Sequence, residues 1–307
     1  MSRGPPGGRS PVRGGRMIEV LAPGPYATVQ DLGRPGYGHL GVPRSGAADA
    51  PSLRLANRLV GNPEGAAGIE LTFGGCGLRF SAGAWVALAG APCPVELLVP
   101  APAPGDGRDP RAGMCAPFWV PAGGRMRVGT PATGLRTYLA VRGGVDVPPV
   151  LGSRSADSLS GLGPAPLAPG DVLPVGRTRA LPPITVDAAP PRPAGPPVLR
   201  ILPGPRDDWF APGALEALCA GPYEVSQDSN RVGVRLRGPA LERARNGELP
   251  SEGMVAGALQ VPPDGQPIVF LADHPPTGGY PVVAVLAAAD LAAVAQLRPG
   301  DLVRFRR

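Results

Sequence analysis

Polar and charged side chains gather in four turn-rich segments of this 307-residue chain, and the first extends over residues 28–36 and 41–49. Its chemistry-bearing residues are Gln30, Asp31, Arg34, Ser45 and Asp49. Backbone N–H groups and the Arg34 guanidinium could bind a carboxylate or phosphate, while Ser45 and Asp49 hydrogen-bond a substrate. The alternative is a set of turns followed by a helix, in which Asp49 serves only as the N-terminal cap. Loops of this kind are where sites usually lie.

The second and third segments each combine an arginine with other polar groups. Residues 151–157 offer two serines, Arg154 and Asp157, and residues 227–233 place Arg231 just before an apolar strand. Taken alone, the second segment is more typical of a turn than of a site. Arg231 could likewise be a simple surface charge.

The fourth segment is the densest in polar residues and covers 251–254, 260–267 and 273–281. Several of its polar side chains flank a continuous apolar strand and would stand at the ends of that strand. They are Glu252, Gln260, Gln266, Asp273 and Thr277. Gly278 and Gly279, just before Tyr280, would let a ligand approach the backbone closely. The arrangement is typical of the polar mouth of a β-barrel, with or without a ligand site.

Several standard catalytic patterns are missing from the sequence. It contains no GxSxG elbow, no HExxH motif and no GxGxxG after a strand, and His39 and His274 are its only histidines. A histidine-rich metal site is therefore excluded. Each of the two histidines is more typical of a hydrogen-bonding loop or core residue than of a catalytic base.

All 30 basic residues are arginines, so the chain has no lysine. Biotinyl-lysine, Schiff-base and Walker A chemistry each need the lysine amine. Any ATP or biotin must therefore be handled in another way or arrive on a partner.

The net charge of +6 is concentrated in an N-terminal tail whose four arginines leave +2 for the rest of the chain. Without a basic stripe interleaved with aromatic residues, nucleic-acid binding is disfavoured. The four cysteines form no CxxC pair, and no apolar run approaches the length of a membrane span. We expect reduced thiols in a cytoplasmic protein, with residues 1–16 disordered and Met17 as a candidate natural start.

Short apolar runs separated by glycine and proline predict antiparallel barrels or sandwiches. The predicted strands are 85–89, 95–99, 126–128, 137–141, 198–202, 232–236, 268–272, 281–286 and 302–305. Three helices are expected: one capped by Asp49, one near 212–220 and one capped by Asp290.

Proline-rich residues 188–197 predict a semi-rigid linker between two domains that span 17–187 and 198–307. The segments LAPGDVL at 167–173 and LRPGDLV at 297–303 hint at two related barrels. A turn before a final strand is common enough to explain the match by chance.

Taken in chain order, these segments resemble one protein family. The matching motifs are TVQDLGR at 28–34, GVPRSGAAD at 41–49, SLRLAN at 52–57, SEGM at 251–254, QVP at 260–262, DGQPI at 264–268 and TGGYP at 277–281. They resemble the family of the 5-oxoprolinase C subunit, also called the biotin-dependent carboxyltransferase or allophanate hydrolase subunit 2 family.

The resemblance implies a mainly β fold of two cyclophilin-like β-barrel subdomains with a few short helices. It implies a subunit of an ATP-dependent 5-oxoprolinase that, with homologues of the 5-oxoprolinase A and B subunits, hydrolyses 5-oxo-L-proline to L-glutamate. ATP with Mg²⁺ would act in the complex, and biotin would be involved only if a partner carried it. Two alternatives stay open: a carboxyltransferase subunit of a biotin-dependent urea or amide carboxylase, and a non-enzymatic antagonist of a kinase-inhibitor partner.

Motif membership and chemical suitability assign candidate roles within this resemblance. Catalytic roles fall to Asp31, Ser45, Asp49, Glu252 and Asp273. Substrate-binding roles fall to Gln30, Arg34, Arg154, Asp157, Arg231, Gln260, Gln266, Thr277 and Tyr280. The three arginines are the expected ligands for anions, and no metal site is assigned to particular residues.

Overall fold

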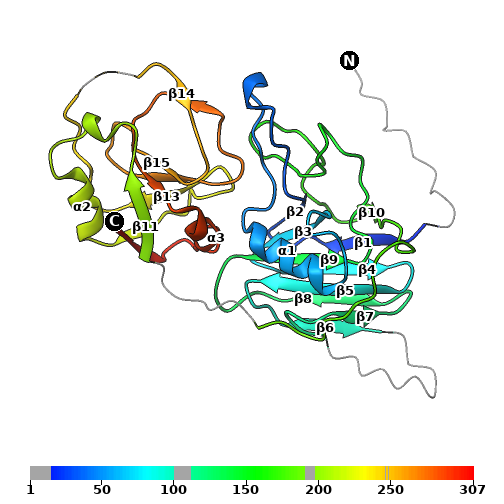
Figure 1. Cartoon of the computed structure of the whole chain (residues 1–307). Coiled ribbons are helices and arrows are strands. Elements are labelled where there is room, and N and C mark those ends of the chain that lie inside the picture. Colours follow the sequence, from blue (N-terminus) through cyan, green and yellow to red (C-terminus); the bar gives the residue numbers. More distant parts are fainter. Residues whose placement is uncertain (1–14, 100–111, 191–197, 246, 248) are drawn as a thin grey trace, which may run out of the picture.

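A computed structural model describes residues 15–99, 112–190, 198–245, 247 and 249–307. Figure 1 shows two β-rich units side by side, the first built from β1 to β10 and the second from β11 to β19. The expected linker at 188–197 stays a prediction, because its residues 191–197 lie outside the described residues. The expected N-terminal extension also lies outside them, except for Gly15 and Arg16.

The ten strands of the first unit form two five-stranded antiparallel sheets that enclose one apolar core. One sheet has the order β10-β1-β4-β8-β6, from Val172–Pro174, Met17–Ala22, Cys76–Phe80, Arg125–Val128 and Val95–Leu98. The other has the order β2-β3-β9-β5-β7, from Tyr26–Gln30, Gly68–Thr72, Arg136–Val141, Ala84–Gly90 and Phe118–Val120. The unit is therefore built from two sheets rather than from one continuous closed sheet.

Burial along the strands reflects what covers each sheet. In β8 buried and exposed residues alternate, as they do when one sheet face meets the core and the other meets water. All six residues of β9 are buried, because helix α1 (Ala50–Leu59) packs on the second face. Small side chains allow this close approach, with Ala56 of the helix packed in one cluster with Ala87 and Ala140 of the sheet.

The second unit is a closed barrel in the order β11-β18-β15-β16-β13-β12-β19. These strands are Val198–Pro203, Val282–Leu286, Ala258–Gln260, Ile268–Phe270, Gly233–Arg237, Tyr223–Val225 and Leu302–Arg306. A small separate hairpin joins β14 (Glu252–Gly253) to β17 (Thr277–Gly278). Leu199, Val283 and Phe305 lie in the barrel core. The mainly β prediction is thus confirmed, and a strand forms at every predicted position.

Helices are few and short, as predicted, and are α1, α2 (Ala214–Ala220), α3 (Leu291–Val294) and the single turns Gly38–Leu40, Asp207–Trp209 and Ala288–Asp290. Asp49 caps α1 by accepting from the Ser52 N–H at 3.1 Å, which confirms that prediction. The prediction that Asp290 caps the third helix is wrong at the side chain. Its carboxylate instead accepts from the Arg200 backbone and guanidinium, which offer a full charge.

The cysteines behave as the sequence predicts: all four are free, and Cys76, Cys93 and Cys115 are buried. Burial raises the pKa of the Cys76 thiol to about 12. No helix in the described part of the chain is long and apolar enough to cross a membrane.

Candidate functional site

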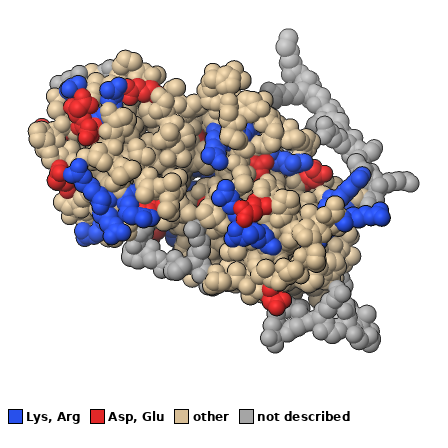
Figure 2. Space-filling model, viewed as in Figure 1, with Lys and Arg blue, Asp and Glu red and all other residues tan. Residues whose placement is uncertain are grey.

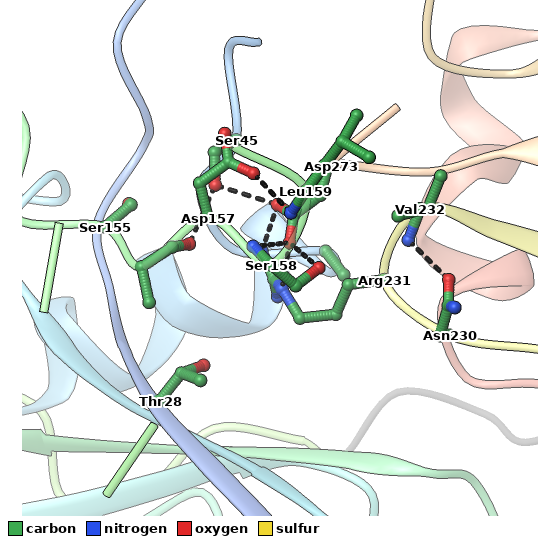
Figure 3. A network of polar contacts seen from close by, with 12 residues as sticks. Thr28, Ser45, Ser155, Asp157, Ser158, Leu159, Asn230, Arg231, Val232 and Asp273 are labelled. Carbon is green, nitrogen blue, oxygen red and sulfur yellow. Dashed lines mark hydrogen bonds and ion pairs between the residues drawn. The ribbon is translucent and has the colours of Figure 1, made fainter. Parts of the chain in front are cut away.

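Loops from both units and one strand residue meet at the seam between the units and form one polar cluster, which is buried except at Ser158. Figure 3 shows part of it in close-up. The first unit contributes Ser45 from the loop after β2, Glu70 from β3 and Ser158 from the loop before β10. The second unit contributes Arg231 before β13 and Asp273 after β16. We call these five residues the seam network. Residues from all four polar segments of the sequence analysis, or directly adjacent to them, therefore converge here.

The centre of the seam network is a bidentate ion pair between Arg231 and Asp273. The Nε and Nη2 atoms of Arg231 lie 2.9 Å from the two carboxylate oxygens of Asp273. Ser45 donates to Asp273 at 2.8 Å, and the Ser158 hydroxyl and N–H donate to it at 2.7 and 3.0 Å. Asp273 is 0% exposed and Arg231 is 3% exposed. Every oxygen of the Asp273 carboxylate is therefore occupied by protein donors.

The charges in this cluster stabilise one another's ionised forms. Burial alone would raise the pKa of Asp273, but the Arg231 charge and the hydrogen bonds from Arg231 and Ser158 outweigh it and lower that pKa. Burial alone would lower the pKa of Arg231, yet Glu70 and Asp273 raise it above its usual range. Arg231 and Asp273 are thus fixed charges rather than groups poised to exchange protons.

Glu70 is a member of the network that sequence reasoning missed. It accepts from Arg231, from the Ala48 N–H at 3.0 Å and from the Tyr138 hydroxyl at 2.8 Å. The sequence carried no signal for it, because only the structure shows that Glu70 in the short run GIELT is 1% exposed. A carboxylate in that position must find a positive partner inside the protein.

The predicted catalytic residues Asp31 and Asp49 are buried and hold local structure. Asp31 accepts from the Gly33 N–H at 2.8 Å, from the hydroxyls of Ser153 and Ser155 at 2.6 Å each, and from the Arg154 N–H at 2.6 Å. It thereby ties the loop after β2 to residues 153–155. Asp49 accepts from Ser52 and also from the Gln296 amide of the second unit at 2.8 Å.

Three further predicted residues lie in the first unit outside the seam network: Gln30, Arg34 and Asp157. Each has one buried polar atom without a hydrogen bond. Gln30 donates to the Ala156 carbonyl at 3.0 Å, and Arg34 donates to the Ser155 carbonyl. The Arg34 and Asp157 side chains are fully buried, and their charged atoms are 3.8 Å apart. Arg154 instead lies near the surface, where it pairs with Asp146 at 2.7 Å.

Four of the five remaining predicted residues lie on the second unit around the hairpin of β14 and β17. Glu252 is paired with Arg206, whose hydrogen bond lowers the Glu252 pKa although burial opposes it. Thr277 is exposed, and Tyr280 is 40% exposed. Gln260 is buried and donates to the Tyr280 carbonyl at 3.1 Å. These residues form a second polar area, which we call the hairpin site.

Gln266 belongs to neither area. Its amide bonds both the N–H and the carbonyl of Gly238, at 2.9 and 3.2 Å, and so closes a turn within the barrel. Nothing in the sequence distinguished it from its neighbours in the same motif.

The chemistry open to the two areas differs. In the seam network Arg231 pairs with both Glu70 and Asp273, and Arg136 lies 3.5 Å from Glu70 as a second cation, so these charges suit positioning of the loops around them. At the hairpin site Thr277 and Tyr280 are exposed, so an incoming small molecule can reach them. Among the described residues, no three His, Cys, Asp or Glu side chains are grouped to hold a metal ion. The guanidiniums of Arg34 and Arg231 are engaged by protein groups, so the described seam does not fit an ATP phosphate chain.

Comparison with known proteins defines the class first. Residues 40–307 match the model of the carboxyltransferase domain, subdomains A and B. The crystal structure of TTHA0988 matches with a TM-score of 0.82 and 39% identity over 100% of this chain and 60% of that chain. The Kluyveromyces lactis urea amidolyase structure gives a TM-score of 0.83 at 34% identity, over 94% of this chain and 18% of that chain.

Curated relatives are of two kinds. The C subunit of the Escherichia coli K12 5-oxoprolinase is 38% identical over 94% of this chain and 90% of the relative. The urea amidolyase of Lachancea kluyveri is 36% identical over 94% of this chain but only 17% of the relative. The chain belongs to the carboxyltransferase-domain family that includes the 5-oxoprolinase C subunit, as its sequence motifs predicted.

Proposed function

We propose that this chain is a subunit of an ATP-dependent 5-oxoprolinase that hydrolyses 5-oxo-L-proline to L-glutamate. The observation that carries the proposal is the extent of the match to the C subunit of the E. coli 5-oxoprolinase, which covers 90% of that protein. The match to the urea amidolyase of Lachancea kluyveri covers 17% of the protein. The partners would be homologues of the 5-oxoprolinase A and B subunits.

Opening a lactam requires attack on a resonance-stabilised amide. ATP with Mg²⁺, bound in the complex, would supply the phosphoryl group that makes the lactam carbonyl a better electrophile. Because the described seam does not fit a phosphate chain, we place ATP binding on one of the partners. This chain would bind and orient the lactam at the hairpin site, while the seam network holds the surrounding loops.

A second candidate function is carboxyl transfer to urea or a similar amide. The urea amidolyase match at 36% identity and the carboxyltransferase domain model favour it. Since the chain has no lysine, biotin would have to be carried by a partner. A non-enzymatic role as an antagonist of a kinase-inhibitor partner is the outcome if neither reaction occurs.

The deciding experiment measures ATP-dependent glutamate release from 5-oxoproline by the chain alone and mixed with its A- and B-type partners, using biotin-free components. We expect release only in the full mixture. A complex that assembles but releases no glutamate would contradict the proposal. Transfer of labelled bicarbonate to urea in the presence of a biotin carboxylase and its carrier would then establish the second candidate.

A further inference from the structure

Arg243 at the hairpin site differs from the arginines that the sequence singled out as anion ligands. Arg154 and Arg231 each pair with a carboxylate, and Arg34 faces Asp157. Arg243 has no acidic partner among the described residues. Its Nη2 donates to the Val261 carbonyl at 2.6 Å, and its Nε is buried without any hydrogen-bond partner. The Arg243 residue as a whole is only partly buried, so the rest of its guanidinium can offer an N–H to an acceptor from outside the chain.

The anchoring of Arg243 fixes where its charge lies. Its backbone bridges to Phe210, and the guanidinium carbon lies 5.7 Å from the centre of the Tyr280 ring. Val261, which holds Nη2, donates its own N–H to the Pro281 carbonyl at 3.0 Å. The guanidinium is therefore held against the strand ends that carry Gln260 and Tyr280.

Gln260, the residue before Val261, offers a complementary group. Its Nε2 donates to the Tyr280 carbonyl, which leaves Oε1 as a free acceptor with no donor among the described residues. Gly278 makes room for this side chain, because a Cβ there would lie 2.7 Å from Gln260 Nε2. Tyr280, whose ring is 40% exposed, supplies an apolar wall that a small ring can contact.

We propose that Arg243 binds the carboxylate of the substrate while Gln260 Oε1 accepts the hydrogen bond of its lactam N–H. In 5-oxoproline the carbon next to the lactam nitrogen carries the carboxylate. Two neighbouring protein groups can therefore bind the carboxylate and the lactam N–H at the same time. Arg243 is then a substrate-binding residue that selects a lactam carrying a carboxylate. This inference rests on the proposed 5-oxoprolinase function.

The test compares the wild type with Arg243→Gln and Arg243→Lys in the complex assembled with the A- and B-type partners. Charge-assisted hydrogen bonds contribute about 1.5–3 kcal/mol, so the KM for 5-oxoproline should rise about tenfold to a hundredfold in Arg243→Gln. Arg243→Lys should recover part of that loss. The inhibition constant of 2-pyrrolidinone, the same lactam without the carboxylate, should change less than about twofold, since the charge pair is absent from it.

Arg245→Gln is the matched control, because Arg245 is two residues away, exposed and paired with Asp208 at 3.0 Å. It should leave both constants unchanged. An unchanged KM in Arg243→Gln, with an active wild type, would overturn the inference and leave the proposed function intact. Equal loss of affinity for 5-oxoproline and 2-pyrrolidinone would show that Arg243 only supports the fold. A wild-type complex without activity would overturn the proposed function and this inference with it.

Discussion

At the scale of single residues, the chain contains the same bidentate arginine–aspartate pair in two environments. Arg231 and Asp273 are buried in the seam network, with side chains 3% and 0% exposed. Arg200 and Asp290 form a similar pair at the surface, at 2.6 and 3.0 Å, with the arginine side chain 49% exposed. Replacing Asp273 would deprive the buried donors Arg231 and Ser45 of an acceptor, although Arg231 would keep its ion pair with Glu70, whereas water compensates the exposed pair.

We therefore predict that Asp273→Asn lowers the free energy of unfolding by about 1–3 kcal/mol, the usual cost of leaving buried hydrogen-bond donors without an acceptor. Asp290→Asn should cost no more than about 1 kcal/mol, as expected for an exposed pair. Urea unfolding followed by circular dichroism measures both variants. Equal losses of unfolding free energy in the two variants would mean that burial does not strengthen the contribution of Asp273.

The pH dependence of the same variants follows from the lowered pKa of Asp273. A carboxyl whose pKa is lower in the folded state stabilises the protein above its unfolded pKa of about 3.9. This stabilisation disappears as the pH falls from that value through the folded-state pKa. Acid unfolding of Asp273→Asn should therefore show less loss of stability over this range than the wild type.

At the scale of elements, the loop between β2 and α1 is closed at its base by two glycines. Gly33 and Gly46 both have positive φ angles, +82° and +97°. A Cβ on Gly33 would lie 2.5 Å from the Arg44 carbonyl and 2.6 Å from that of Ser45. The close approach of the Gly33 backbone to these carbonyls places Ser45 where its hydroxyl reaches Asp273. Gly36, farther along the loop, also has a positive φ of +96°, but no atom lies within 4 Å of the position that a Cβ would take there.

We predict that Gly36→Ala costs about 1–2 kcal/mol, the penalty of a left-handed conformation for a residue with a Cβ. Gly33→Ala should cost a further ~1–3 kcal/mol because the new Cβ overpacks the base of the loop. Chemical denaturation measures the free energy of unfolding of both variants and so tests whether Gly33→Ala costs more than Gly36→Ala. Similar costs for both variants would show that the base of the loop can shift freely.

At the scale of the whole molecule, the two units are joined at a second place besides the seam network. Gln296, just after α3, accepts from the N–H groups of Leu135 and Arg136 at 2.9 and 2.8 Å. It donates to Asp49 and to the Arg136 carbonyl. Arg298 adds hydrogen bonds to carbonyls of residues 131–134 of the first unit. Figure 1 shows α3 on the side of the second unit that faces the first, and Figure 2 shows the hollow that remains between the two halves on this face.

We predict that Gln296→Ala weakens the coupling between the units by about 1–3 kcal/mol, because it removes the acceptor of the Leu135 and Arg136 N–H groups of the first unit. Calorimetry should show one unfolding transition for the wild type and a broadened or split transition for this variant. Gln266→Ala is the control, since its amide bonds only Gly238 within the barrel. A single sharp transition for Gln296→Ala would contradict the prediction.

Much of the fold was predictable because its signals are local. Apolar runs between glycine and proline located the strands, and Asp49 before Pro51 located helix α1. Strands such as β3 and β4, with fewer consecutive apolar residues, gave no such signal. Asp290 was assigned wrongly because a capping pattern does not reveal that Arg200, 90 residues away, competes for the carboxylate.

The sequence by itself determined the family, the β-rich class, the absence of lysine chemistry and the segments in which polar groups gather. Only the tertiary structure decided which of those polar groups remain available to bind a ligand. Arg231 and Asp273 are 42 residues apart, and Glu70 is 161 residues from Arg231, so their mutual neutralisation depends on the packing of two units. The same packing left Arg243 and Gln260 with free hydrogen-bonding atoms. Charge pairing and burial act through space, and a linear pattern of residues does not encode them.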